Sequence, residues 1–74
     1  MAKEKILIVD DEETIRRLCL KIFKEKEYIP VEAGSTTDAL DLAKAEMFDL
    51  VLVDMRMPGM NGLHLIQQIR EIQK

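Results

Sequence analysis

Apolar residues along the chain follow two alternating patterns. Short runs of nearly consecutive apolar positions cover residues 5–9, about 28–33, and 50–53. A run of this length that ends at acidic or turn-forming residues is typical of a parallel strand covered on both faces. After each run, apolar residues recur at intervals of three and four, which is typical of a helix with one apolar face. The chain is therefore predicted to contain three strand–helix units in succession.

Each predicted helix has an apolar stripe that we expect to face a core. Ser35, followed three positions later by Asp38, resembles a capping box and predicts where the second helix begins. A loop with glycine and proline, residues 55–62, is expected to connect the third strand to the last helix. The three stripes consist of Ile15, Leu18, Cys19, Ile22 and Phe23; of Ala39, Leu42, Ala43 and Met47; and of Leu65, Ile66, Ile69 and Ile72.

The order of the strands in the sheet follows from one proline. Pro30 lies in the second run and has no N–H to donate, so that strand is expected at a sheet edge beside the first strand. The third strand then lies on the other side of the first, which gives the order 2-1-3. Right-handed crossovers in opposite directions place the first and second helices on opposite faces. We therefore predict an α/β fold, a three-stranded parallel sheet with helices on both faces.

Three aspartates follow two of the predicted strands. Asp10 and Asp11 come directly after the first strand, and Asp54 comes directly after the third. Ligands of such sheets bind beyond the carboxyl ends of the strands near the switch in strand order, where all three would lie. Three neighbouring carboxylates remain charged together only with a compensating cation, and oxygen ligands favour Mg²⁺ or Mn²⁺. The same cation could screen a phosphoryl group that a carboxylate oxygen attacks.

A structural alternative explains part of this pattern. Asp11, Glu12 and Glu13 could stabilise the positive end of the first helix without binding any ion. Spacing alone leaves both interpretations open. Asp54 favours the cation site, because it ends a different strand and precedes a loop in which Pro58, Gly59 and Gly62 constrain the path.

Composition narrows the classes of function. The chain has 74 residues with 47% hydrophobic and 34% charged, so we expect it to fold. Its net charge of -3 gives no basic surface for nucleic acid. No apolar run approaches the roughly 20 residues of a membrane span, and we expect a cytoplasmic protein. The single cysteine, Cys19, cannot form an internal disulfide or a thiolate metal site.

Two segments together resemble a known family. Asp10-Asp11 after the run Ile6-Leu7-Ile8-Val9, combined with the segment Asp54-Met55-Arg56-Met57-Pro58-Gly59-Met60-Asn61-Gly62 after the third run, resembles the receiver domain of two-component response regulators. The resemblance is in register along the whole chain. It implies a flavodoxin-like fold, here a partial (βα)3 unit in residues 1–74.

The resemblance also assigns residues to a phosphorylation site. Asp54 matches the phosphoacceptor, which receives a phosphoryl group from phosphohistidine on a histidine kinase or a histidine phosphotransfer protein. Asp11 and Asp54 match direct Mg²⁺ ligands, and Asp10 matches a ligand that usually acts through water. The backbone carbonyl of Arg56 matches a further ligand. A stoichiometric signalling element is expected, not a turnover enzyme.

Other matches concern the loop and the first helix. Pro58 and Gly62 match residues that shape the loop and start the last helix. In the family the first helix contacts the phosphodonor, which makes Ile15 and Leu18 candidate docking residues. Their place in the apolar stripe also predicts core packing, which we take as their default role.

The family pattern extends beyond what the chain supplies. Receivers have five βα units and this chain has three, so we expect it to be the N-terminal part of a receiver. The resemblance places a Ser/Thr, a Lys and an aromatic switch residue in the later units. We expect weakened Mg²⁺ binding, slow phosphorylation and no ordinary conformational signalling. An unpaired apolar third strand also predicts a homo-oligomer, such as a two-fold dimer through residues 50–53.

Two alternatives belong to other classes of function. An Mg²⁺-dependent phosphatase with an aspartate nucleophile would need a second aspartate two residues later, where this chain has Arg56. A structural half-domain would only self-associate or complement another partial receiver, without phosphotransfer.

Overall fold

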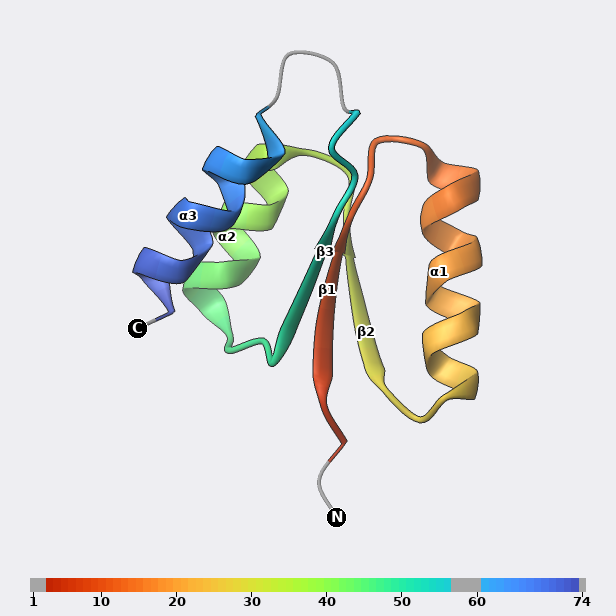
Figure 1. Cartoon of the computed structure of the whole chain (residues 1–74). Helices are drawn as coiled ribbons and strands as arrows, with labels where there is room; N and C mark the ends of the chain where they lie inside the picture. Colours follow the sequence, from red (N-terminus) through yellow and green to blue (C-terminus); the bar gives the residue numbers. More distant parts are fainter. Residues whose placement is uncertain (1–2, 57–60, 74) are drawn as a thin grey trace.

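The three apolar runs form one parallel sheet with strands in the order β2-β1-β3, as predicted (Figure 1). The computed structural model describes residues 3–56 and 61–73. Along the chain the elements are β1 (Lys5–Val9), α1 (Glu13–Glu25), β2 (Ile29–Ala33), α2 (Thr36–Ala45), β3 (Leu50–Val53) and α3 (Gly62–Ile72). The predicted α/β fold with a flavodoxin-like strand order is therefore confirmed.

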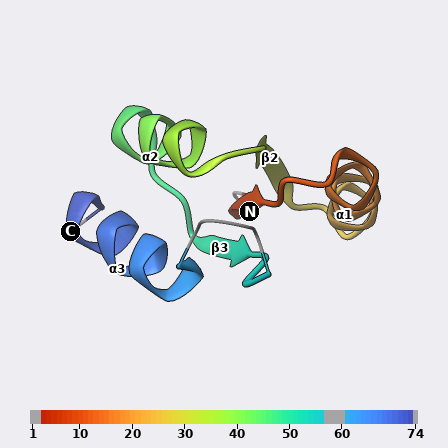
Figure 2. The same ribbon diagram turned by 90° about the horizontal axis from the view of Figure 1, so that it is seen from above.

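The helices form a layer on each face of the sheet. Figure 2 shows α1 on one face and α2 and α3 together on the other. Pro30 lies on the edge strand β2 and pairs with Ile6 of β1, so the position without an N–H lies at the edge, as expected. Central β1 is therefore the strand at which the chain switches direction across the sheet.

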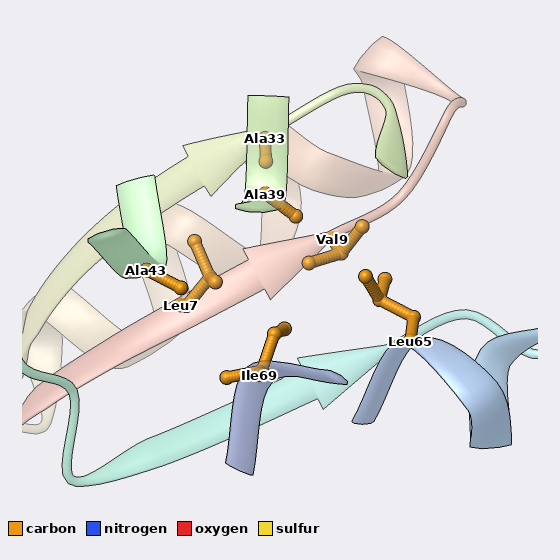
Figure 3. Close-up of a cluster of buried hydrophobic side chains, with 7 residues drawn as sticks. All are labelled: Leu7, Val9, Ala33, Ala39, Ala43, Leu65 and Ile69. Carbon is orange, nitrogen blue, oxygen red and sulfur yellow. The ribbon is translucent and has the colours of Figure 1, made fainter. Parts of the chain in front are cut away.

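The core lies between the sheet and the pair α2 and α3. Leu7 of β1 has no exposed surface, and Leu65 of α3 has 1%. Ala39 and Ala43 present only methyl groups to β1, which lets α2 lie close to the strand. Figure 3 shows the buried cluster, which consists of Leu7, Val9, Ala33, Ala39, Ala43, Leu65 and Ile69.

Two of the predicted apolar stripes face this core. The stripes of α2 and α3 supply buried Ala39, Ala43, Leu65 and Ile69. The inclusion of Met47 was wrong, because α2 ends at Ala45 and Met47 is 63% exposed. The helical spacing continued by chance into the connection that leads to β3.

The prediction that the stripe of α1 faces a core was wrong for three of its residues, whereas Cys19 and Phe23 of the same stripe are half-buried. No residue of α1 is buried, and Ile15, Leu18 and Ile22 are 40%, 54% and 41% exposed. Among the described residues α1 packs on β1 and β2 but not on β3, so part of its stripe extends past the strands it covers.

None of the helices in residues 3–56 and 61–73 is both long and apolar enough to cross a bilayer.

The start of α2 follows the predicted cap. Ser35 is the N-cap residue, and its hydroxyl oxygen accepts a hydrogen bond from the Asp38 amide at 3.1 Å. This bond satisfies one of the amides that a helix leaves unpaired in its first turn. The sequence pattern therefore located the helix start correctly.

The side chain of Gln73 links the end of α3 to the end of α2 and the connection before β3. Its amide nitrogen donates to the carbonyls of Ala43 and Glu46 at 2.8 and 2.6 Å. Its amide oxygen accepts from the Phe48 amide at 2.8 Å. One side chain thus satisfies three backbone groups that α2 and its connection leave without helical or strand partners.

Replacing Gln73 with alanine is expected to lower the free energy of unfolding by about 1 to 3 kcal/mol, because part-buried backbone groups lose their partners. Urea unfolding followed by circular dichroism measures this change. Gln67→Ala is the matched control, since Gln67 lies on the exposed side of α3. Equal effects of the two substitutions would show that the Gln73 bonds do not contribute.

Candidate functional site

The ends of β1 and β3 lie side by side at one edge of the sheet. Val9 pairs with Val53 in the parallel register, so the residues that follow them leave the sheet together. The Asp54 amide donates to the Val9 carbonyl at 2.9 Å. This bond continues the ladder by one step and places Asp54 next to Asp10.

The structure brings together the three aspartates that the sequence singled out. One carboxylate oxygen from each of Asp10, Asp11 and Asp54 lies within 4.8 Å of the other two. Asp10 is buried, Asp54 is partly buried and Asp11 is exposed. We call these three side chains the acidic cluster. It opens to solvent on the side of Asp11.

Hydrogen bonds within two tight turns orient two members of the acidic cluster. Asp10 Oδ1 accepts from the Glu12 amide, and Asp54 Oδ1 accepts from the Arg56 amide, both at 2.9 Å. Each bond joins a side chain to the amide two residues later, the arrangement of an Asx turn. An ionised carboxylate accepts about four bonds, so both groups keep capacity for a metal ion.

The helix-capping alternative accounts for Glu13, which lies in the first turn of α1, but it does not account for the acidic cluster. Glu12 is the N-cap residue of α1, but its side chain makes no capping hydrogen bond. Glu13 pairs instead with Arg17 at 2.7 Å. The side chain that bonds to this turn is that of Asp10, which also belongs to the acidic cluster.

The acidic cluster has the donor set of a hard divalent cation. It offers only carboxylate oxygens, and their spread of up to 4.8 Å suits an ion that keeps part of its water shell, as Mg²⁺ does. Arg56 Nε lies 3.5 Å from Asp54 Oδ1, but the arginine side chain is 89% exposed. Since an exposed ion pair of this kind contributes little, Arg56 does not replace the cation.

Gly62 allows α3 to begin close to the end of β3. It is buried, and a Cβ there would collide with Met55 Sδ and lie 3.3 Å from Val53 Cγ1. The preceding residue, Asn61, is the N-cap and accepts from the His64 amide at 3.2 Å. The predicted role of Gly62 at the start of the helix therefore has a steric reason. Pro58 and Gly59 lie outside the described residues.

The sequence did not reveal the position of Arg16 beside the acidic cluster. Arg16 is not part of the apolar stripe predicted for α1. Its guanidinium contacts the Asp10 carbonyl and Glu32 of β2. No spacing signal connects residues on separate elements, so this contact could be found only in the tertiary structure.

The predicted roles of Asp54 as phosphoacceptor and of the Arg56 carbonyl as a metal ligand stay predictions.

Comparison with known sequences identifies a family and close relatives. The family model described as "Response regulator receiver domain" matches residues 6–74. Sporulation initiation phosphotransferase F of Bacillus subtilis is 42% identical over 72 residues, which are 97% of this chain and 58% of that protein. Transcriptional regulatory protein ResD of the same organism is 40% identical over 67 residues, 90% of this chain and 28% of that protein.

Solved structures show the same arrangement of elements. The chemotaxis protein CheY4 of Vibrio cholerae superposes with a TM-score of 0.88 at 30% identity, covering 95% of this chain and 58% of that one. Response regulator protein TrrA of Thermotoga maritima, solved in complex with Mg²⁺ and BeF, superposes with a TM-score of 0.83 at 37% identity. That match covers 92% of this chain and 59% of TrrA. The chain thus spans somewhat over half the length of these two proteins and of phosphotransferase F.

Proposed function

Because the chain belongs to the receiver domain family of two-component response regulators, we propose that it accepts a phosphoryl group on Asp54 with the help of Mg²⁺. The observation that carries the proposal is the convergence of Asp10, Asp11 and Asp54 at the ends of two neighbouring strands. The complex of the relative TrrA with Mg²⁺ and BeF supports the choice of metal.

The residues of the site have two roles in this proposal, binding Mg²⁺ and attacking the phosphoryl group. Asp10, Asp11, Asp54 and the Arg56 carbonyl would hold Mg²⁺, which neutralises charge on the incoming phosphoryl group. The Arg56 amide donates to Asp54 Oδ1, so we assign the attack to Oδ2. The bond from Oδ2 to phosphorus forms as the bond from phosphorus to the histidine nitrogen of the donor breaks. No proton needs to leave Asp54, because its carboxylate attacks as the anion.

The phosphodonor is a histidine kinase or a histidine phosphotransfer protein. The candidate docking residues Ile15 and Leu18 are exposed on α1, the helix that follows Asp10 and Asp11 in the chain. Their exposure removes the competing role in core packing. An exposed apolar pair on the helix that follows Asp10 and Asp11 suits contact with a helical donor surface.

We further propose that residues 1–74 form the N-terminal part of a receiver, since longer relatives match the chain over nearly its whole length. In receivers the later units carry a hydroxyl and a lysine donor for the phosphoryl group. Loss of one preorganised hydrogen-bond donor from an enzyme active site raises the reaction barrier by about 3 kcal/mol. The 74-residue chain is therefore expected to bind Mg²⁺ weakly and to be phosphorylated slowly.

Labelling by a small phosphodonor tests the proposed function. The 74-residue chain is incubated with acetyl phosphate, with and without Mg²⁺, and weighed by mass spectrometry. One added phosphate that requires Mg²⁺ and maps to the peptide containing Asp54 supports the proposal. Label that maps to another residue contradicts it.

A second candidate function is self-association as a structural half-domain. Leu50 and Leu52 of β3 are 44% and 43% exposed on the face that α1 leaves uncovered. Within the described residues, β3 pairs only with β1, so its other edge has no strand partner. Exposed apolar strands with an open edge favour pairing with another chain. A second copy that pairs through β3 would cover both features.

Sedimentation velocity at micromolar concentration tests self-association, and a dimer is expected. Leu52→Lys is expected to weaken the dimer about 100-fold or more, because an unpaired charge would be buried in the interface. Leu63→Lys is the control, since Leu63 is 56% exposed on α3 across the sheet. A stably folded monomer at this concentration contradicts self-association.

A further inference from the structure

We infer that Arg16 is a positioning residue of the acidic cluster, and that it holds the turn after β1 in the conformation that presents Asp10 and Asp11 to Mg²⁺. The inference rests on the proposed function, since it concerns the same carboxylates. Arg16 lies on α1, and its side chain is only 16% exposed. Its Nη1 donates to the Asp10 carbonyl at 3.0 Å, and its Nε donates to Glu32 Oε1 at 2.6 Å.

The Asp10 carbonyl needs this donor because the neighbouring strand has ended. The last pair between β1 and β2 is Val9 with Ala33, and the Asp10 amide still donates to the Ala33 carbonyl at 3.1 Å. In a parallel ladder the amide and carbonyl of one residue face the same neighbouring strand. The Asp10 carbonyl thus faces the place where β2 would have continued. Arg16 supplies the missing hydrogen bond.

The end of β2 is shaped to receive the guanidinium. Glu32 supplies a charged acceptor for Nε, and Gly34 leaves the space that the group occupies. A Cβ at Gly34 would lie 3.0 Å from Arg16 Nη1, closer than ordinary contact. Two different guanidinium nitrogens serve two acceptors, one in the turn after β1 and one on β2. The planar fork of arginine fits that task, whereas the single ammonium of lysine does not.

These contacts restrain Asp10 at three atoms. Its amide is bound to Ala33, its carbonyl to Arg16, and its Oδ1 to the Glu12 amide. Asp11 is the next residue, so its direction depends on the same backbone. Removing a residue that orients metal ligands typically weakens metal affinity about 10- to 100-fold. Loss of Arg16 should therefore weaken Mg²⁺ binding.

The charge of Arg16 has the opposite effect, and this makes the inference testable. A guanidinium near the acidic cluster repels Mg²⁺. If Arg16 acted only through its charge, replacing it with a neutral residue would therefore tighten Mg²⁺ binding. Loss of positioning would weaken binding. The direction of the change in Mg²⁺ affinity therefore distinguishes the two effects.

The test is a titration of the 74-residue chain with Mg²⁺, followed by amide chemical shifts in nuclear magnetic resonance spectra. Arg16→Gln is expected to raise the dissociation constant about tenfold. Arg16→Lys is expected to restore little of the affinity. Glu32→Ala is expected to weaken binding as well, and the double variant is expected to match Arg16→Gln. Arg17→Gln is the matched control, because Arg17 is 70% exposed and pairs with Glu13 within α1.

Several outcomes would overturn the inference. Arg16→Gln that binds Mg²⁺ as tightly as the unaltered chain, or more tightly, excludes positioning. Full restoration by Arg16→Lys shows that the planar fork is not required. Wild-type affinity in the double variant, where one positive and one negative charge are lost together, shows an effect of charge alone. Urea unfolding establishes that each variant is folded. Should Arg16→Gln not fold, unchanged affinity in both Arg16→Lys and Glu32→Ala overturns the inference.

Failure of the inference can be separated from failure of the proposed function. Mg²⁺ binding that Asp11→Asn removes but Arg16→Gln preserves contradicts only the role of Arg16. An unaltered chain that binds no Mg²⁺ contradicts the proposed function and the inference together.

Discussion

Replacing Asp54 with asparagine is expected to abolish phosphoryl labelling of the chain by acetyl phosphate and Mg²⁺. The neutral amide has neither the charge nor the nucleophilicity of the carboxylate, so the bond to phosphorus cannot form. The substitution also removes one of the three carboxylates of the acidic cluster. Asparagine has nearly the shape of aspartate, and its side-chain oxygen can still accept from the Arg56 amide. The fold is therefore expected to persist while labelling is lost.

Mass spectrometry of the intact chain over a time course measures this loss. Asp41→Asn is the matched control, because it makes the same chemical change at an exposed position on α2. We expect the control to label like the unaltered chain. Equal labelling of the Asp54 variant and the unaltered chain would remove Asp54 from the phosphoacceptor role.

Replacing Leu7 with alanine is expected to leave most of the chain unfolded at room temperature. Leu7 has no exposed surface and lies in the central strand, against α2 and α3. Truncating a buried leucine to alanine costs about 2 to 5 kcal/mol. Whole domains are stable by only about 5 to 15 kcal/mol, and a short chain falls near the lower limit. The cost is thus comparable to the entire stability of the fold.

Circular dichroism during urea unfolding measures the effect. Leu63→Ala is the control, because it removes the same atoms at a position on α3 that is 56% exposed. We expect the control to change the free energy of unfolding by less than about 1 kcal/mol. Similar losses from the two substitutions would mean that the core is not where the structure places it.

The parallel sheet could be predicted from local patterns because its signals are short in range. Runs of apolar residues specified the strands, and Pro30 specified which strand lies at the edge. The Ser35 cap marked the start of α2. The proximity of Asp10 and Asp54 also followed, since parallel neighbours must end at the same edge of the sheet.

The exposure of α1 could not be predicted, because the same stripe fits a buried helix and a helix that covers only part of the sheet. Burial depends on which strands lie beneath the helix. The structure shows that α1 covers β1 and β2 and leaves Leu18 exposed. Periodicity identifies an apolar face but does not specify its partner.

By itself, the sequence determined the order of the elements, the strand order and the meeting of three aspartates, because these depend on periodicity and on the geometry common to all parallel sheets. Only the tertiary structure decided which apolar face is covered. It also revealed that Arg16 reaches the Asp10 carbonyl and that Gln73 joins α3 to α2. In these contacts a side chain bonds to backbone groups of another element. The sequence pattern does not show which backbone groups lack a hydrogen-bond partner in the helices and strands, so it does not predict which side chain will bond to them.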